Sequence, residues 1–408
     1  MKKVFVLVAV AALFAVSCKD DTKGEVLAPD QEKETLDETC TKAIEMLSVE
    51  NWQETDGIIT GTAEVVSNIN PDASLYEWLG NTMESFYVEN EDYDLMIIDP
   101  STVKGAFSVV NDTLYVAESN GLTLDYALED GTACKAAFDV KASSTRLLVN
   151  QEESISETGE TTITGKTYLV VPESVNAQLN ADGKKAVAAK LTAKVGVAGE
   201  VPAFNDTFEG TAEFECGSYT LAVTRAKYST SEIALSTSFK YGKTTILAAN
   251  FTAKGKLVFN AENEEPDLMK TTGKVDANIA LLDNVELKGD FDWDKVKTLV
   301  GSPMSGTEAS AKELAAKLEE YVHLTLYIQK TAQAKLGFEA VSSVEGGSIA
   351  EVVWDVKPVV RFEDGSQYQL PEEFFSPDGF PKTLEAIDNL LAEIEAAFAA
   401  QERVEPTE

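Results

Sequence analysis

The chain has 408 residues, of which 44% are hydrophobic, enough to form the core of one large domain or two ordinary ones. Its 69 Asp and Glu residues outnumber its 34 Lys and Arg residues and give a formal net charge of −35. Such an acidic surface repels nucleic-acid phosphates and anionic lipid head groups, so we expect no nucleic-acid partner and favour neutral or cationic partners.

The N-terminus has the pattern of a secretory signal. Lys2 and Lys3 precede an uncharged run at 4–16, which is shorter than the about 20 residues that a membrane-spanning helix needs. The run ends in Ala15-Val16-Ser17-Cys18, which resembles a lipobox, with Ala15 in place of the usual Leu. We predict a signal peptide at 1–17 and lipidation of Cys18. The alternative is an ordinary signal peptide with a chance cysteine.

Charged residues follow Cys18 directly, namely Lys19, Asp20 and Asp21. This stretch resembles the export signal of Bacteroidetes-type outer-membrane surface lipoproteins, and the length and acidity of the chain are similar to theirs. The resemblance implies a protein anchored to the outer membrane through lipid on Cys18 and displayed on the cell surface. The alternative is an anchor in the inner leaflet, facing the periplasm. Residues 18–30 are polar and predict a tether.

The next segments predict two helices with a strand between them. Residues 31–48 carry apolar side chains at helical spacing, and Asp30 could cap this helix. Residues 57–68 predict a strand. Residues 73–87 predict a short helix whose apolar stripe includes Trp78.

From about 93 to 291 the pattern is a succession of strands. The segment 185–197 is the clearest, because its apolar residues lie on one face and Lys190, Thr192 and Lys194 on the other. Asp182-Gly183 predicts a hairpin turn before it. Residues 274–282 and 285–291 repeat the alternation.

Glycines recur inside the predicted strands, and interior glycine lets a strand bend or twist sharply. They are Gly61, Gly105, Gly165, Gly210, Gly255, Gly273 and Gly289. They predict a strongly coiled sheet, as in a barrel or half-barrel. The near copies at 61–65 and 210–214 indicate a duplication or a coincidence.

After 291 the pattern predicts helices at 292–300 and 307–322, with Thr307 as a cap. Strands follow at 323–330, 333–342, 349–357, 359–363 and 366–370, and an amphipathic helix at 380–400 ends the chain. The expected fold class is α+β, mostly β: a large, strongly coiled antiparallel sheet, a half-barrel-like meander, packed on amphipathic helices including the C-terminal one. We expect 31–408 to form a single large domain, with possible subdivision near 200–206 or 292–306.

The cysteines after Cys18 are in phase with apolar neighbours. Cys40 lies on the apolar stripe of a predicted helix, and Cys134 and Cys216 lie on the apolar faces of predicted strands. We therefore predict that all three are small buried hydrophobic residues. A disulfide between two of them is the alternative.

The sequence offers no catalytic constellation. The single histidine, His323, is expected to be structural or exposed, and no nucleophile elbow, phosphate loop or dinucleotide fingerprint occurs. Asp290, Asp292 and Asp294 alternate but lack the rest of a calcium loop, and Asp292 could instead cap the following helix. The acidic runs at 89–94 and 262–267 are expected to be solvated loops. We therefore predict no catalytic, cofactor or metal residues.

Four tryptophans are candidate sugar platforms, although packing is the favoured role for each. They are Trp52, Trp78, Trp293 and Trp354. The sequence favours a non-enzymatic lipoprotein that binds a small hydrophobic ligand or partner. The alternatives are a structural or adhesive surface protein and a glycan-binding or glycan-cleaving accessory protein. An enzyme is the least favoured class, although two carboxylates of a glycosidase could be hidden among the many acids.

Overall fold

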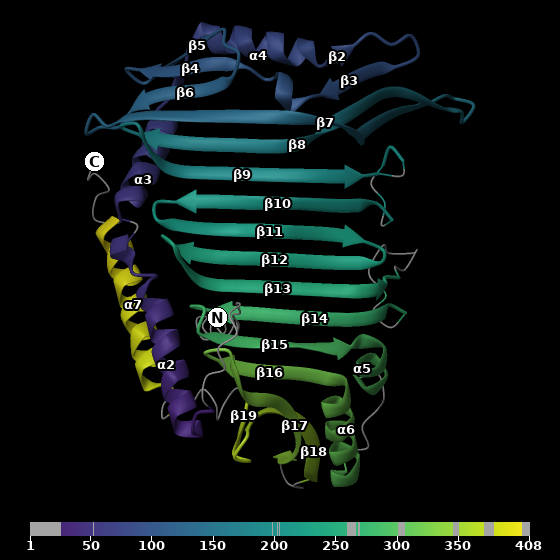
Figure 1. Ribbon diagram of the computed structural model, residues 1–408. Helices are drawn as coiled ribbons and strands as arrows, with labels where there is room; N and C mark the ends of the chain where they lie inside the picture. Colours follow the sequence, from purple (N-terminus) through teal and green to yellow (C-terminus); the bar gives the residue numbers. More distant parts are fainter. Residues whose placement is uncertain are drawn as a thin grey trace. The chain divides into compact units, whose positions relative to one another are not determined.

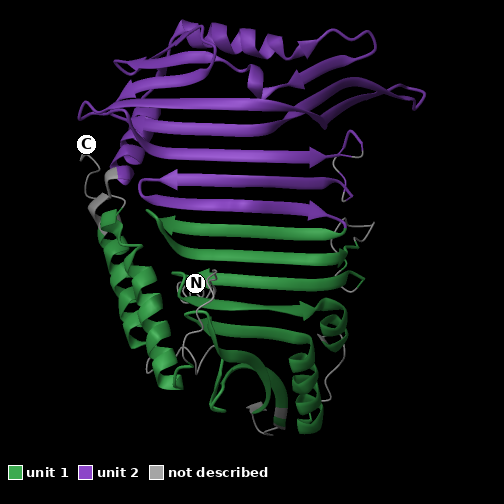
Figure 2. Cartoon of the chain, in the orientation of Figure 1, with its two compact units in different colours: residues 1–51, 231–408 green, residues 52–230 purple. Residues whose placement is uncertain are grey.

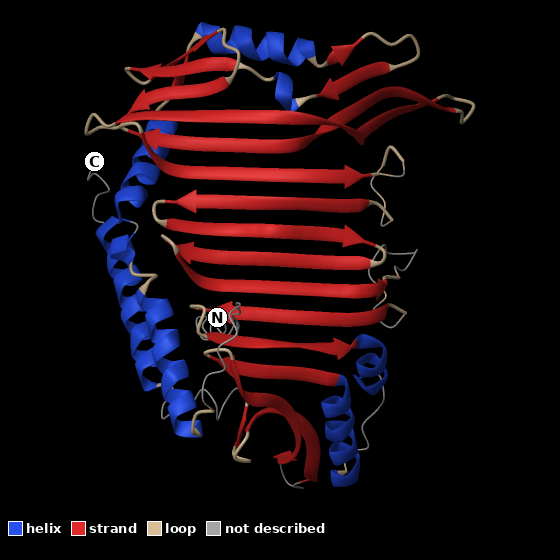
Figure 3. Cartoon of the chain, in the orientation of Figure 1, coloured by secondary structure: helices blue, strands red, loops and turns tan. Residues whose placement is uncertain are grey.

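A computed structural model describes residues 26–401 apart from 52, 198, 202, 204, 259–266, 268–269, 301–306, 346–350 and 371–378. The described residues form nineteen strands and six α-helices, so the fold is mostly β (Figure 3). The predicted signal peptide, Cys18, residues 19–21 and Trp52 lie outside the described residues. Within the described ranges, no helix combines the length and the apolar composition that a membrane span needs.

The chain divides into two compact units, coloured separately in Figure 2. Unit 1 comprises residues 1–51 and 231–408, and unit 2 comprises residues 52–230. The possible boundaries that the sequence predicts, near 200–206 or 292–306, lie at other places in the chain.

Unit 2 contains eleven described strands and two α-helices. The helices are α3 (Gln53–Ser67) and α4 (Ala73–Ser85), and a 3₁₀ turn, η2 (Pro100–Thr102), precedes β4. The strands are β1 (Asn70–Pro71), β2 (Tyr87–Val88), β3 (Asp94–Ile98), β4 (Gly105–Val110), β5 (Thr113–Ala117), β6 (Leu122–Ala127), β7 (Ala133–Ile155), β8 (Thr161–Ala181), β9 (Lys184–Gly196), β10 (Thr207–Cys216) and β11 (Tyr219–Ser229). Strands β6 to β11 pair in chain order and antiparallel, as in the predicted meander.

The prediction of a purely antiparallel sheet is wrong for unit 2, whose sheet is mixed. Three strand pairs are parallel: β1 with β5, β3 with β8, and β4 with β6. Strand β4 pairs antiparallel with β5 on one side and parallel with β6 on the other, so it lies between two strands that follow one another in the chain. Period-2 alternation reports which face is buried and says nothing of the neighbouring strand's direction.

Unit 1 contains an antiparallel meander of eight strands in chain order. They are β12 (Glu232–Tyr241), β13 (Thr244–Lys256), β14 (Thr272–Leu281), β15 (Val285–Asp292), β16 (Val322–Ile328), β17 (Thr331–Glu345), β18 (Glu351–Phe362) and β19 (Gln367–Gln369). Among the described pairings, none closes either unit's strands into a ring. The predicted strands 349–357 and 359–363 are one strand, which passes through Pro358.

The helices of unit 1 are α2 (Pro29–Glu45), α5 (Trp293–Val300), α6 (Glu308–Tyr321) and α7 (Pro381–Gln401), with the 3₁₀ turn η1 (Val49–Asn51) after α2. Thr307 caps α6 as predicted. The cap of α2 is Ala28 and not Asp30, because Pro29 occupies the first helical position, where its fixed φ is favourable. Helix α6 contacts β16, β17 and β18, and α7 lies beside α2 (Figure 1).

The strand predicted at 57–68 is wrong, because these residues belong to helix α3. Ile58 and Val65 face the same way on a helix and pack against the sheet of unit 2. Tertiary packing thus overrides the local β preference of these β-branched residues. Gly61 therefore lies in a helix, whereas Gly105 begins β4 and the other five glycines lie inside strands. At Asp182-Gly183 the predicted hairpin is confirmed, with φ angles of 48° and 75°.

Candidate functional site

The strand register of unit 2 creates one continuous apolar face. Side chains of directly paired residues point to the same side of a sheet. From β6 to β11 the central row is Leu122, Phe138, Ala177, Ala189, Phe214 and Leu221. The rows on either side are Leu124, Ala136, Leu179, Val187, Cys216 and Tyr219, and Val140, Val175, Leu191, Ala212 and Val223. No charged residue belongs to these three rows.

The opposite face of the same strands is polar. Its rows include Asp139, Asn176, Lys190 and Glu213, which pair in that order. Lys135 also forms an ion pair with Asp125 on this face, with an Nζ to Oδ1 distance of 3.0 Å. The alternation predicted for 185–197 is therefore confirmed, and it extends over six strands.

Helix α3 covers one end of the apolar face. Ile58 and Val65 pack against a buried cluster formed by Tyr126, Cys134 and Ala181. The hydroxyls of Tyr126 and Thr62 are 2.7 Å apart and hydrogen-bonded, which satisfies the phenol away from water. Burial raises the pKa of the Tyr126 phenol.

A cleft of about 600 Å³ lies between the two helices of unit 2 and this face. Its walls come from Val66, Ile69, Trp78, Phe107 and Leu114, and its floor from strands β6 to β9. Small side chains line the middle of the floor, namely Ala136, Ala177 and Ala189. The only polar residues along it are Thr123 and Gln178, and the register directs both side chains to the opposite face. The volume falls within the range of small-molecule sites.

Trp78 of α4 forms a fixed wall of the cleft. Its indole Nε1 donates to the Lys104 carbonyl at 2.7 Å, and its ring meets Phe107 edge-on with centroids 4.9 Å apart. With its one polar group satisfied, the indole presents only apolar surface to the cleft. The sequence had placed Trp78 on an apolar stripe, and the side chain is half-buried.

The apolar face remains exposed beyond the cleft. Phe138 and Leu191 each retain 41% of their surface, Phe214 retains 45% and Leu221 retains 52%. Exposed apolar residues that adjoin one another over several strands are typical of a binding surface and not of scattered surface residues.

The acidic and histidine candidates of unit 1 do not assemble into a reactive site. His323 is exposed and lies 3.5 Å from Asp290 through its Nδ1. Asp294 pairs with Lys297 at 3.0 Å and accepts a hydrogen bond from the Gly273 amide. Among the described side chains, no group of three His, Cys, Asp or Glu residues is arranged to hold a metal ion. The acidic run at 262–267 lies almost wholly outside the described residues.

The three described cysteines are free thiols. Cys40 and Cys134 are buried, as predicted, and Cys216 is half-buried. Burial, with a smaller contribution from Asp37, raises the pKa of the Cys40 thiol to about 12. Such thiols remain protonated at neutral pH and behave as apolar side chains.

Sequence reasoning found the apolar parity of β7, β9 and β10 but not the cleft itself. No sequence pattern distinguishes the wall residues Phe107 and Leu114, and the sequence at 57–68 predicts a strand where the structure has helix α3. The alternation on each strand shows which of its residues are apolar. It predicts the floor of the cleft only when the order of the neighbouring strands is known. No protein-family model, curated protein or solved structure matches the chain.

Proposed function

We propose that the chain is a non-enzymatic lipoprotein, anchored to the outer membrane through lipid on Cys18, that binds a hydrophobic ligand in the cleft of unit 2. The observation that carries the binding role is the apolar lining of the cleft. Its two polar residues, Thr123 and Gln178, direct their side chains to the opposite face, and alanines lie in the middle of its floor. The anchor rests on the pattern of Lys2, Lys3 and the Ala15–Cys18 motif, and surface display rests on the charged residues that follow.

The proposal includes a strongly coiled sheet whose concave side is closed by helices. Interior glycines support the coiling. At Gly210 an added Cβ would lie 2.6 Å from the carbonyl oxygen of Thr192 on the neighbouring strand, a closeness that side-chain-bearing residues do not tolerate. Helix α3 is the proposed cover within unit 2, and α6 and the C-terminal helix α7 are the proposed covers within unit 1.

The experiment uses two substitutions on adjacent residues of β9 that point to opposite faces. Ala189→Phe fills the floor of the cleft, whereas Ala188→Phe adds the same bulk to the polar face. Both are made in the mature chain with Cys18→Ser, so that its own acyl chains do not compete, and thermal unfolding verifies that both fold.

The probe is N-phenyl-1-naphthylamine, whose fluorescence rises in apolar sites. We expect Ala188→Phe to bind it like the parent chain and Ala189→Phe to bind it at least tenfold more weakly. Equal binding by both variants, or no binding by the parent, would contradict the proposal and favour a structural or adhesive protein.

A further inference from the structure

The central apolar row continues past the cleft. The lining of the cleft ends at Ala189 on β9, whereas the paired residues run on to Phe214 on β10 and Leu221 on β11. These two side chains are about half exposed. The part of this row from Phe138 to Leu221, which we call the apolar track, therefore extends farther across the strands than the cleft does.

The length of this track can be compared with that of a lipid chain. Four steps between neighbouring strands separate Phe138 from Leu221, and at about 4.8 Å per step they span roughly 19 Å. A bilayer's hydrocarbon core is about 30 Å thick, so one leaflet's acyl chains extend roughly 15 Å. The track can accommodate one such chain at full length, whereas the cleft alone covers only its first half.

We propose that the ligand is a long-chain amphiphile, with one acyl chain lying across strands β7 to β11 and its first half seated in the cleft. This inference rests on the proposed function and names its ligand class. The chain lies between the flanking apolar rows, with Leu179 and Val187 on one side and Leu191 on the other.

The charge of the face indicates the head group. The three apolar rows contain no Lys or Arg that could pair with a phosphate or a carboxylate, and the chain as a whole has a net charge of −35. An anionic head group therefore gains no partner from these rows, and the net negative charge of the chain disfavours it. The ligand is a lipid with a neutral or zwitterionic head, selected by its chain.

Affinity as a function of chain length tests the inference. Monoacylglycerols with 8, 10, 12, 14 and 16 carbons compete with the naphthylamine probe for the mature Cys18→Ser chain. Each buried CH₂ should increase affinity roughly fourfold. We expect the increase to continue to 14 or 16 carbons, and fatty acids of equal length to bind more weakly than their monoacylglycerols.

A double variant locates the distal half of the chain. Phe214→Ser with Leu221→Ser should leave the affinity for the eight-carbon ligand unchanged and abolish the increase beyond about ten carbons. The matched control, Glu213→Ser with Thr220→Ser, changes the opposite face of the same two strands and should keep the full increase.

The outcomes separate the two proposals. If neither the naphthylamine probe nor any monoacylglycerol binds, the proposed function fails. If the probe binds but no monoacylglycerol displaces it, only the acyl-chain inference fails. If the eight-carbon ligand binds but affinity stops rising with length in the parent chain, or rises equally in the double variant, the acyl-chain track is wrong. A parent chain that sediments as a dimer and a double variant that sediments as a monomer would assign the exposed row to a second copy instead, which also overturns the inference.

Discussion

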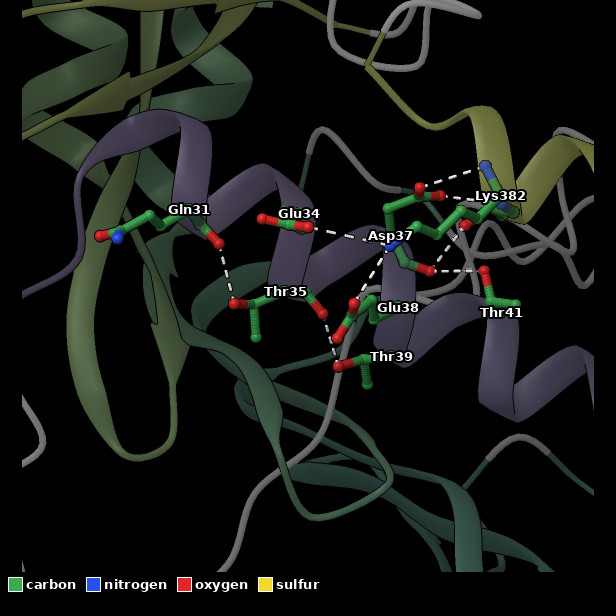
Figure 4. A network of polar contacts seen from close by, with 9 residues as sticks. Gln31, Glu34, Thr35, Asp37, Glu38, Thr39, Thr41 and Lys382 are labelled. Carbon is green, nitrogen blue, oxygen red and sulfur yellow. Dashed lines mark hydrogen bonds and ion pairs between the residues drawn. The ribbon is translucent and has the colours of Figure 1, made fainter.

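The carboxylate of Asp37, in the middle of helix α2, caps the N-terminus of helix α7 by accepting the Thr383 amide at 2.7 Å. Its second oxygen accepts the Lys382 amide at 3.1 Å, and Asp37 is 3% exposed. Figure 4 shows Lys382 reaching from α7 towards Glu38 on α2, with its ammonium 3.1 Å from that carboxylate. A second contact joins Ser48 to Glu393, so the two helices run parallel.

Replacing Asp37 should loosen this helix pair. Asp37→Ala leaves the first amides of α7 without an acceptor in a buried place, which should lower the free energy of unfolding by roughly 1–3 kcal/mol. Urea denaturation measures the change. Glu34→Ala is the control, because that carboxylate is exposed and 3.8 Å from the Lys382 ammonium; it should change stability by less than about 0.5 kcal/mol. Equal effects of the two substitutions would contradict the capping role.

Glu32 should make the stability of unit 1 depend on pH. Its side chain is 1% exposed, and burial, with Asp364 and Glu363 as smaller causes, raises its pKa from 4.5 to about 7. Between these two pKa values, the Glu32 carboxyl therefore keeps its proton in the folded chain and releases it in the unfolded chain. The stabilising contribution is complete below pH 4.5 and is lost as the pH rises through 7, by at most roughly 3 kcal/mol.

Glu32→Gln keeps the side chain neutral at every pH. We expect the variant to gain stability relative to the parent between pH 5 and pH 8, as measured by urea midpoints at both values. Glu34→Gln should show no such gain, because the Glu34 carboxylate is exposed on the same turn of α2. If the parent and Glu32→Gln differ by the same amount at both pH values, Glu32 is ionised in the folded chain and the account of its burial is wrong.

Two glycines should respond to alanine in opposite ways. In β10, a Cβ on Gly210 would meet both the Thr192 carbonyl oxygen and the Phe208 ring at 2.9 Å or less, so Gly210→Ala should destabilise the fold by roughly 1–3 kcal/mol. In helix α3, nothing lies within 4 Å of a Cβ on Gly57, and Gly57→Ala should stabilise the helix by about 0.5–1 kcal/mol. Thermal unfolding of both variants checks the signs. Stabilisation by Gly210→Ala would contradict the close strand approach.

Cys18→Ser should prevent lipid attachment and leave the chain unprocessed or released from the membrane fraction. Incorporation of radiolabelled palmitate in the producing bacterium measures acylation, and fractionation measures location. Cys134→Ser is the matched control, because this thiol is buried in the fold, and the variant should stay acylated. A Cys18→Ser chain that still incorporates palmitate would rule out Cys18 as the lipid site.

Periodicity predicted most of the elements but not their assembly. The strand at 185–197 and the final helix were readable because one face of each is apolar over many residues. The stretch at 57–68 was not, because Ile58 and Val65 are spaced for a helix while their β-branched side chains favour strands. The parallel pairing of β3 with β8 joins residues far apart in the chain, and no local pattern encodes such a partner. The cleft depends on that assembly, so only its floor could be anticipated.

Native mass spectrometry tests the central claim most directly. The mature Cys18→Ser chain, purified without detergent, should carry a mass excess equal to one long-chain neutral lipid, and this excess should be absent from Ala189→Phe and present in Ala188→Phe. A parent chain with no bound lipid, or an equal excess in both variants, would contradict the assignment of the apolar cleft as the binding site.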